Sequence, residues 1–226
     1  MVINDRHRFV FIHVPKSAGR SMKQSLETLP GNNSRWVAAS NHEPFSVFRS
    51  RWRERCSLAD RILRRSPDGY RTFGFVRNPW DRIASLYRYL VEKSTRKPGV
   101  ASLKSFDDFL LQLDDGVAWI GNLHSMRLQT NFFTDEHGRT TIDFAGHFEH
   151  LAEDVPRVAE LLGIDFRMPH VNRTSNSDRD YRQAYRADRL VEIIRNRFAS
   201  DIEQFGYEFE QPLPRRRCSG PLSISS

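Results

Sequence analysis

The feature that most constrains the fold of this chain is the stretch FIHVPKSAGRSM, residues 11–22. Residues 8–14 are mostly apolar, aromatic or β-branched, which predicts a buried strand that ends at Pro15. A helical pattern begins at Gly19, and the residues before it are small or basic. A strand, a loop of small residues and a helix N-terminus together favour an anion site, because the first backbone N–H groups of a helix have no partner within it.

This loop matches the nucleoside-triphosphate loop G-x-x-x-x-G-K-[ST] only in part. Gly19-Arg20-Ser21 would align with G-K-[ST], but Val14 would then replace the first glycine, and the lysine comes earlier, at Lys16. The next predicted strand ends in Arg77, where a Mg²⁺-dependent site would need an aspartate. The sequence therefore indicates an anion that is neutralised by side chains without a metal. A structural turn with a solvated lysine is the alternative interpretation.

A second cluster of interest reads FGFVRNPWDRIASLY. Residues 71–76 predict another buried strand, and Asn78 suits the N-cap of a helix with Asp81 in its first turn. Arg77 leaves the strand beside this helix N-terminus, where its planar guanidinium suits a phosphate, and Ser85 lies about two turns further on. Two interpretations stay open: Arg77 and Ser85 bind an anion, or Arg77 pairs with Asp81 while Ser85 only packs.

The rest of the chain alternates between strand and helix patterns. Helices are expected over residues 19–29, 43–65, 79–91, 105–113, 117–126, 149–162 and 186–205. Short strands are expected at 35–39, 130–133 and 140–145, with a loop at 94–102. This order predicts an α/β fold: one domain, residues 1–210, with a central parallel sheet and flanking helices. Residues 211–226 are predicted to be a basic, disordered tail.

Composition narrows the function classes further. The 226 residues carry a formal net charge of +7, which favours an anionic partner, although a solvated basic surface would give the same excess. Cys56 and Cys218 lie far apart, so neither a disulfide framework nor a cysteine zinc site is expected. Since the sequence shows neither a signal-peptide core nor a membrane-span pattern, we expect a cytoplasmic protein without a transmembrane segment.

Taken together, PKSAGRS after the first strand and FVRNPWDRxxSLY after the second resemble the PAPS-dependent sulfotransferases, especially the carbohydrate and heparan type and its bacterial relatives. PAPS is 3′-phosphoadenosine-5′-phosphosulfate. The resemblance covers roughly residues 8–209 and continues in TIDFAGHFEHLAEDVPRVAELLGI, PHVNRTSNSDRDYRQAY and IEQFGYEF. It implies the P-loop-like sulfotransferase fold and transfer of a sulfuryl group from PAPS to a hydroxyl or amine. A carbohydrate or a glycolipid would be the acceptor.

The resemblance also implies, position by position, which residues bind PAPS. The loop for the 5′-phosphosulfate would consist of Lys16, Ser17, Ala18, Gly19, Arg20 and Ser21. The 3′-phosphate would be held by Arg77 and Ser85, with Arg173 as a further candidate. Several relatives have a small Thr or Ser at the position of Arg20. Arg20 therefore either adds a contact to the phosphosulfate or points outward and pairs with an acid.

By analogy with phosphoryl transfer, sulfuryl transfer depends mostly on positioning and charge stabilisation. Lys16 is the candidate that neutralises the bridging oxygen as the 3′,5′-bisphosphate leaves. The sulfonate carries less charge than a terminal phosphate, so no metal is required. In the heparan-type O-sulfotransferases that this chain resembles, a His or Glu between the two cofactor motifs can serve as general base. The resemblance therefore favours His42 by position, with Glu43, His124 or another residue as alternatives. His13, on the first strand, is expected to be buried with its hydrogen bonds satisfied.

Two other functions compete with this hypothesis. A phosphate-loop kinase would require Mg²⁺. A non-enzymatic basic protein would bind polyanions with a steep salt dependence and show no turnover, and the basic segment 49–65 keeps this alternative open. The expected partners are a nucleotide donor and a carbohydrate or glycolipid acceptor, with no nucleic acid. The sequence leaves the acceptor's identity and the oligomeric state open.

Overall fold

The computed structural model describes residues 1–32, 42–62, 69–93, 98–135, 137–166, 168 and 180–210. Its central sheet has the strand order β1-β2-β3-β4. The bounds of the strands are β1 (Val2–Asn4), β2 (Phe9–Ile12), β3 (Arg71–Val76) and β4 (Phe144–His147). The pairs β2–β3 and β3–β4 are parallel, which confirms the predicted α/β fold, whereas β1 pairs antiparallel with β2.

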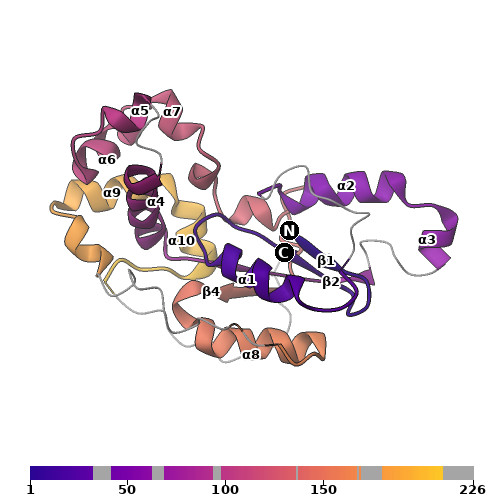
Figure 1. The fold of residues 1–226 in the computed structure, drawn as a ribbon. Coiled ribbons are helices and arrows are strands. Elements are labelled where there is room, and N and C mark those ends of the chain that lie inside the picture. The colour runs from indigo at the N-terminus through magenta and orange to yellow at the C-terminus, as the bar shows by residue number, and fades with distance from the viewer. Residues whose placement is uncertain are drawn as a thin grey trace.

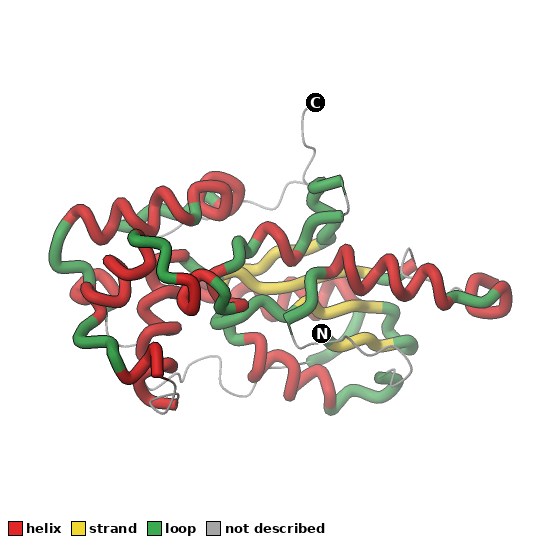
Figure 2. The backbone as a smooth tube through the Cα atoms, turned by 90° about the horizontal axis from the view of Figure 1, so that it is seen from above, coloured by secondary structure: helices red, strands yellow, loops and turns green. Residues whose placement is uncertain are grey.

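Helices flank this sheet, as Figures 1 and 2 show. The α-helices are α1 (Gly19–Glu27), α2 (Phe45–Arg55), α3 (Leu58–Ile62), α4 (Pro79–Lys93), α5 (Pro98–Ala101), α6 (Phe106–Asp114), α7 (Ala118–Gly121), α8 (Leu151–Leu162), α9 (Asp188–Arg197) and α10 (Ala199–Phe205). Short 3-10 helices are η2 (His124–Met126), η3 (Thr130–Phe132), η4 (Phe148–His150) and η5 (Tyr181–Ala184). No helix in the described part of the chain is long and apolar enough to cross a membrane.

The two faces of the sheet are buried separately, because neighbouring strand residues point to opposite sides. Phe9 and Phe11 of β2 pack in one cluster with Met22 of α1 and Val155 of α8. Val10 and Ile12 face the other cluster, which also includes side chains of α2, α4, α6 and α9. Strands buried on both faces read as continuous apolar runs, and this explains why β2 and β3 were predictable from sequence.

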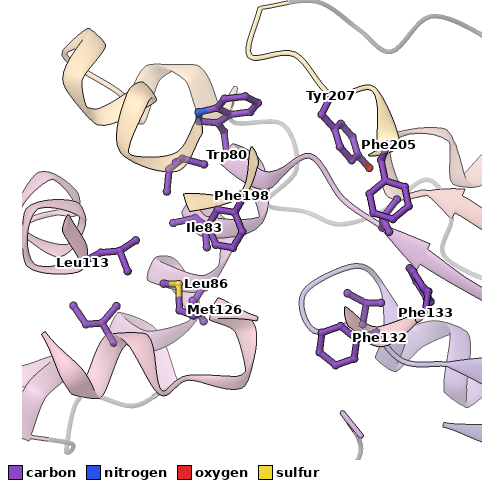
Figure 3. Close-up of a cluster of buried hydrophobic side chains, with 14 of the residues drawn as sticks. Trp80, Ile83, Leu86, Leu113, Met126, Phe132, Phe133, Phe198, Phe205 and Tyr207 are labelled. Atoms are coloured by element: carbon purple, nitrogen blue, oxygen red, sulfur yellow. The ribbon is translucent and has the colours of Figure 1, made fainter. Parts of the chain in front are cut away.

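The second cluster extends into a group of helices at one end of the molecule, with α4 among them (Figure 1). Trp80 and Ile83 of α4 lie beside Phe198, which joins α9 to α10 (Figure 3). The Trp80 indole donates a hydrogen bond of 3.0 Å to the carbonyl oxygen of Val191 in α9. This packing fixes the N-terminal end of α4, which begins two residues after Arg77.

Several predicted elements need correction. The helix expected over 43–65 forms two helices within its described residues, 43–62, since the Ser57 backbone N–H and hydroxyl both donate to Asp60 and start a new helix, α3. Residues 63–65 lie outside the described residues. The helix expected over 186–205 is interrupted at Phe198. Of the loop expected at 94–102, residues 98–101 form α5, and residues 94–97 lie outside the described residues. The segment 117–126 forms only the short helices α7 and η2.

Two strands predicted between η2 and α8 also differ from the structure. Residues 130–132 form the 3-10 helix η3, because Asp201 accepts hydrogen bonds from the backbone N–H groups of Gln129 and Thr130 at 2.8 and 3.0 Å. The strand expected at 140–145 begins later, as β4. The expected strand at 35–39 and the expected tail at 211–226 lie outside the described residues.

Parallel strands place their carboxyl ends along one edge of a sheet, and ligands of open α/β sheets bind outside that edge. In this chain the loop before α1, the residues before α4 and the turn η4 follow β2, β3 and β4 respectively. The fold therefore brings both predicted binding segments to the same edge.

Candidate functional site

The loop between β2 and α1 has an unusual backbone. Lys16 and Ala18 have φ angles of 68° and 58°, in the left-handed region that side chains other than glycine seldom adopt. The buried Ser17 hydroxyl donates to the carbonyl oxygen of Val14 at 2.9 Å, and this bond closes the turn. Residues held in such conformations cost about 1–2 kcal/mol each and concentrate at functional sites.

The N-terminus of α1 is open to an anion. Its N-cap residue, Ala18, supplies no side-chain hydrogen bond, and its first turn contains no acidic residue. The first backbone N–H groups of a helix carry partial positive charge, so a negatively charged group is favoured at this end. Ser21, in the first turn of α1, is exposed.

Gly19 is required at the start of α1 by the side chain of His13. A Cβ atom added at Gly19 would lie 1.8 Å from Cδ2 and 2.1 Å from Nε2 of His13. Such distances are far below van der Waals contact, so one of the two residues would have to move. The glycine thus lets the imidazole of His13 lie against the loop–helix junction.

Arg77 contacts both predicted segments. Its Nε donates to Asp81 at 2.7 Å, and one terminal nitrogen donates to the carbonyl oxygen of Lys16 at 3.1 Å. The guanidinium carbon lies 4.0 Å from the centre of the Phe148 ring, and 9% of the side chain is exposed. The ion pair with Asp81 is therefore present, and Arg77 also touches the loop before α1.

Lys16 lies among other cations. Its ammonium group is 4.4 Å from the centre of the Tyr89 ring on α4. Burial, together with the smaller effects of the neighbouring guanidinium groups of Arg77, Arg88 and Arg20, lowers the pKa of Lys16 to about 8. Positive charges that repel one another in this way are stabilised when an anion binds between them.

Three histidines lie next to one another beside this loop. The ring centres of His13 and His42 are 4.5 Å apart, and those of His42 and His124 are 6.4 Å apart. Burial is the main cause of a lowered pKa for His42, so its imidazole is neutral at pH 7. A neutral imidazole is the protonation state that a general base needs.

The two alternatives to His42 differ from it in their surroundings. Glu43 is buried, and its carboxylate accepts a hydrogen bond of 2.6 Å from Arg51. This ion pair engages one of the two carboxylate oxygens and holds the charged form of Glu43 against Arg51. His124 is exposed on η2. His42 instead contacts the ring of His13, which packs against Gly19 at the end of the loop.

His42 also lines an open pocket of ≈ 280 Å³. The lining residues are polar or charged without exception: His13, Arg20, Lys23, Gln24, Glu27 and His42. The four from α1 recur at the spacing of one helix face. Arg20 is exposed and belongs to this face, so it points outward from the loop. Ser85 is partly exposed on α4, and Arg173 lies outside the described residues.

Comparison with protein families decides the classification. A model described as "Sulfotransferase family" matches residues 1–208, which is most of the chain. The chain belongs to the sulfotransferase family. This membership confirms the resemblance inferred from the two loop motifs.

Individual relatives of this sulfotransferase are distant. An uncharacterized protein of Archaeoglobus fulgidus is 28% identical over 129 residues, which cover 56% of this chain and 94% of the relative. Carbohydrate sulfotransferase 14 of Danio rerio is 26% identical over 185 residues, covering 72% of this chain and 48% of the relative. A crystal structure of a sulfotransferase from Alicyclobacillus acidocaldarius shares 17% identity at a TM-score of 0.47, over 89% of this chain and 96% of that chain.

The structure of this sulfotransferase adds supporting residues that sequence reasoning missed. The Gln129 side chain accepts from the backbone N–H of Arg77 at 2.9 Å and donates to its carbonyl oxygen at 2.8 Å. Asp201 holds the backbone of Gln129 in turn. The carboxylate of Glu149 accepts a 2.6 Å hydrogen bond from the backbone N–H of Asn78. These bonds fix the main chain on both sides of the Arg77 side chain.

Proposed function

We propose that this sulfotransferase transfers a sulfuryl group from PAPS to a hydroxyl group of a carbohydrate, and that the transfer needs no metal. The observation that carries the proposal is the contact between the Arg77 guanidinium and the carbonyl oxygen of Lys16. It places the loop at the N-terminus of α1 beside a buried arginine from the end of β3. PAPS has an anionic group at each end of its ribose, and these two cationic elements match such a pair of charges.

In the proposed reaction, the acceptor oxygen forms a bond to sulfur while the bond from sulfur to the bridging phosphate oxygen breaks. Negative charge develops on that oxygen, and the Lys16 ammonium neutralises it. Nε2 of His42 takes the proton of the acceptor hydroxyl. Ser17 keeps the loop in shape through its bond to Val14, so the backbone N–H groups at the start of α1 face the leaving group.

The acceptor class is proposed from the pocket beside His42. A pocket for a phenol or a steroid is lined mainly by apolar and aromatic side chains. This pocket is lined by polar side chains, and its α1 face offers two cations, an amide and a carboxylate. Such a surface suits a molecule with many hydroxyl groups. The Danio rerio relative, named a carbohydrate sulfotransferase, supports the same assignment.

A transfer assay tests the proposal. The wild-type chain is incubated with PAPS and a metal chelator. The acceptor is an oligosaccharide, a glycolipid or a phenol, and sulfated products are identified by mass spectrometry. We expect sulfuryl transfer to an oligosaccharide and none to the phenol. Phosphorylation that requires ATP and Mg²⁺ would make the chain a kinase instead. Salt-sensitive polyanion binding without any transfer would make it a binding protein.

The rate of transfer is expected to depend on pH through two groups. His42 must be neutral, so kcat/KM rises as pH rises through its pKa, which burial holds below 6.5. Lys16 must be charged, so kcat/KM falls as pH rises through about 8. Measuring kcat/KM between about pH 5 and pH 10 checks both limbs. An alkaline limb that survives in the Lys16→Ala variant would contradict the second assignment.

Arg20 is expected to act on the acceptor and not on the donor. Because its side chain lines the pocket with His42, Arg20→Gln should raise the KM of the acceptor about tenfold, or ~1.4 kcal/mol. The affinity for adenosine 3′,5′-bisphosphate should change less than about twofold. Lys104→Gln, at an exposed position elsewhere, is the matched control. A loss of bisphosphate affinity in Arg20→Gln would assign this arginine to the phosphosulfate instead.

A further inference from the structure

His13 contacts the two halves of the proposed site. It follows β2, and its ring fills the space that a side chain at Gly19 would need. The same ring meets His42 edge to face, at 61° between the ring planes. The backbone carbonyl oxygen of His13 lies 3.4 Å from Nδ1 of His42. One residue therefore links the start of α1 to the candidate base.

The contact with the carbonyl oxygen determines which nitrogen of His42 carries the hydrogen. A carbonyl oxygen only accepts hydrogen bonds, so a hydrogen bond across this 3.4 Å separation requires Nδ1 of His42 to be the donor. In a neutral imidazole the other nitrogen, Nε2, is then without hydrogen and is the basic one. The hydrogen bond also increases the basicity of that second nitrogen, as it does for histidines that bind metals.

The ring of His13 is suited to packing rather than to proton transfer. Burial lowers its pKa to about 3, with smaller contributions from His42, the Met1 amino group, Lys23 and Arg20. Its Nδ1 is buried and has no hydrogen-bond partner within the described residues. A buried polar atom without a partner costs about 1–3 kcal/mol, so the ring is held here at an energetic cost. The expectation that His13 would be satisfied on its strand is not met at this nitrogen.

We propose that His13 is a positioning residue for His42. Its carbonyl oxygen selects the tautomer in which Nε2 of His42 accepts the proton of the acceptor, and its ring, seated against Gly19, ties that orientation to the donor loop. The proposal rests on the proposed function in one respect, which is that His42 is the base. It adds that the same residue holds the loop and the base. A substitution at Gly19 that displaces the ring of His13 should therefore also shift the imidazole of His42.

The first test needs no turnover and no substitution at His13. The ¹⁵N chemical shifts of the imidazole nitrogens are measured by NMR at pH 7.5 (about one unit above the ordinary histidine pKa), and the His42 signals are identified by their loss in His42→Gln. We expect the hydrogen on Nδ1 and a bare Nε2. A hydrogen on Nε2 would overturn the inference. Binding of adenosine 3′,5′-bisphosphate is measured by calorimetry in parallel. Absence of binding would contradict the proposed function, whereas the NMR result for the His42 tautomer would remain valid.

A double-mutant cycle tests the link between the ring and the loop. His13→Ala should lower kcat about 10- to 100-fold, since a displaced catalytic group is costly, while the Kd of the bisphosphate stays within about threefold. Gly19→Ala should weaken bisphosphate binding in the wild-type chain, where the new Cβ meets the ring. In the His13→Ala chain, Gly19→Ala should cause a loss of bisphosphate affinity at least about tenfold smaller than in the wild type. If Gly19→Ala reduced bisphosphate affinity equally in the wild-type and His13→Ala chains, the proposed link would be overturned.

Discussion

Lys16→Ala is expected to lower kcat about 10²- to 10³-fold, the cost of removing one group that stabilises developing charge in a transition state. The ammonium group belongs to the loop between β2 and α1, and the bridging oxygen of PAPS gains charge as the bisphosphate leaves. Alanine keeps a Cβ at this left-handed position, so the backbone strain at residue 16 is unchanged. Steady-state kinetics with PAPS and an oligosaccharide acceptor measure the effect.

The controls for Lys16 separate charge from geometry. Lys16→Arg keeps the positive charge and should recover part of kcat, while Lys104→Ala should leave it unchanged. Lys16 interacts with the leaving oxygen more strongly in the transition state than in the ground state, so KM for PAPS should change far less than kcat. A variant in which KM rises while kcat stays the same would show that Lys16 only binds the donor.

Arg77→Ala is expected to weaken binding of adenosine 3′,5′-bisphosphate about 100-fold, or ~2.7 kcal/mol. The side chain is almost fully buried, so a phosphate bound there would be held by a guanidinium with little competition from water. Its contact with the carbonyl oxygen of Lys16 would also be lost, which loosens the loop. Isothermal titration calorimetry measures the change.

Asp81→Asn distinguishes the two interpretations of Arg77. This substitution removes the charge of the partner in the 2.7 Å ion pair but keeps the arginine. If Arg77 binds the donor, Asp81→Asn lowers the melting temperature by a few degrees and leaves bisphosphate affinity nearly intact. If Arg77 only caps α4, Arg77→Ala and Asp81→Asn should lower stability to a similar extent, and neither should change affinity.

The part of the site formed by consecutive residues was predictable from sequence. The strand β2, the loop to Ala18 and the start of α1 follow one another, so periodicity and small residues were sufficient to predict them. The supports of Arg77 come from far along the chain. Gln129 and Asp201 are 52 and 124 residues away from Arg77, and no local pattern marks either as its partner. Glu149 gives a weaker signal, since it follows shortly after the end of β4.

The interruptions of the predicted helices have a similar explanation. Apolar spacing continues through Phe198, but this side chain is buried against α4, and the backbone leaves the helical conformation there. The role of Gly19 was predicted only as part of a loop of small residues. The ring of His13 that requires it is six residues earlier, and its orientation depends on the packed structure.

The central claim is that the loop before α1 and Arg77 bind the two anionic ends of PAPS. Its most direct test is calorimetric titration of adenosine 3′,5′-bisphosphate, without metal, into the wild type, Lys16→Ala and Arg77→Ala. We predict micromolar binding by the wild type, weaker binding by both variants, and no preference for ATP with Mg²⁺. Binding of ATP with Mg²⁺ in the absence of any binding of the bisphosphate would contradict the claim.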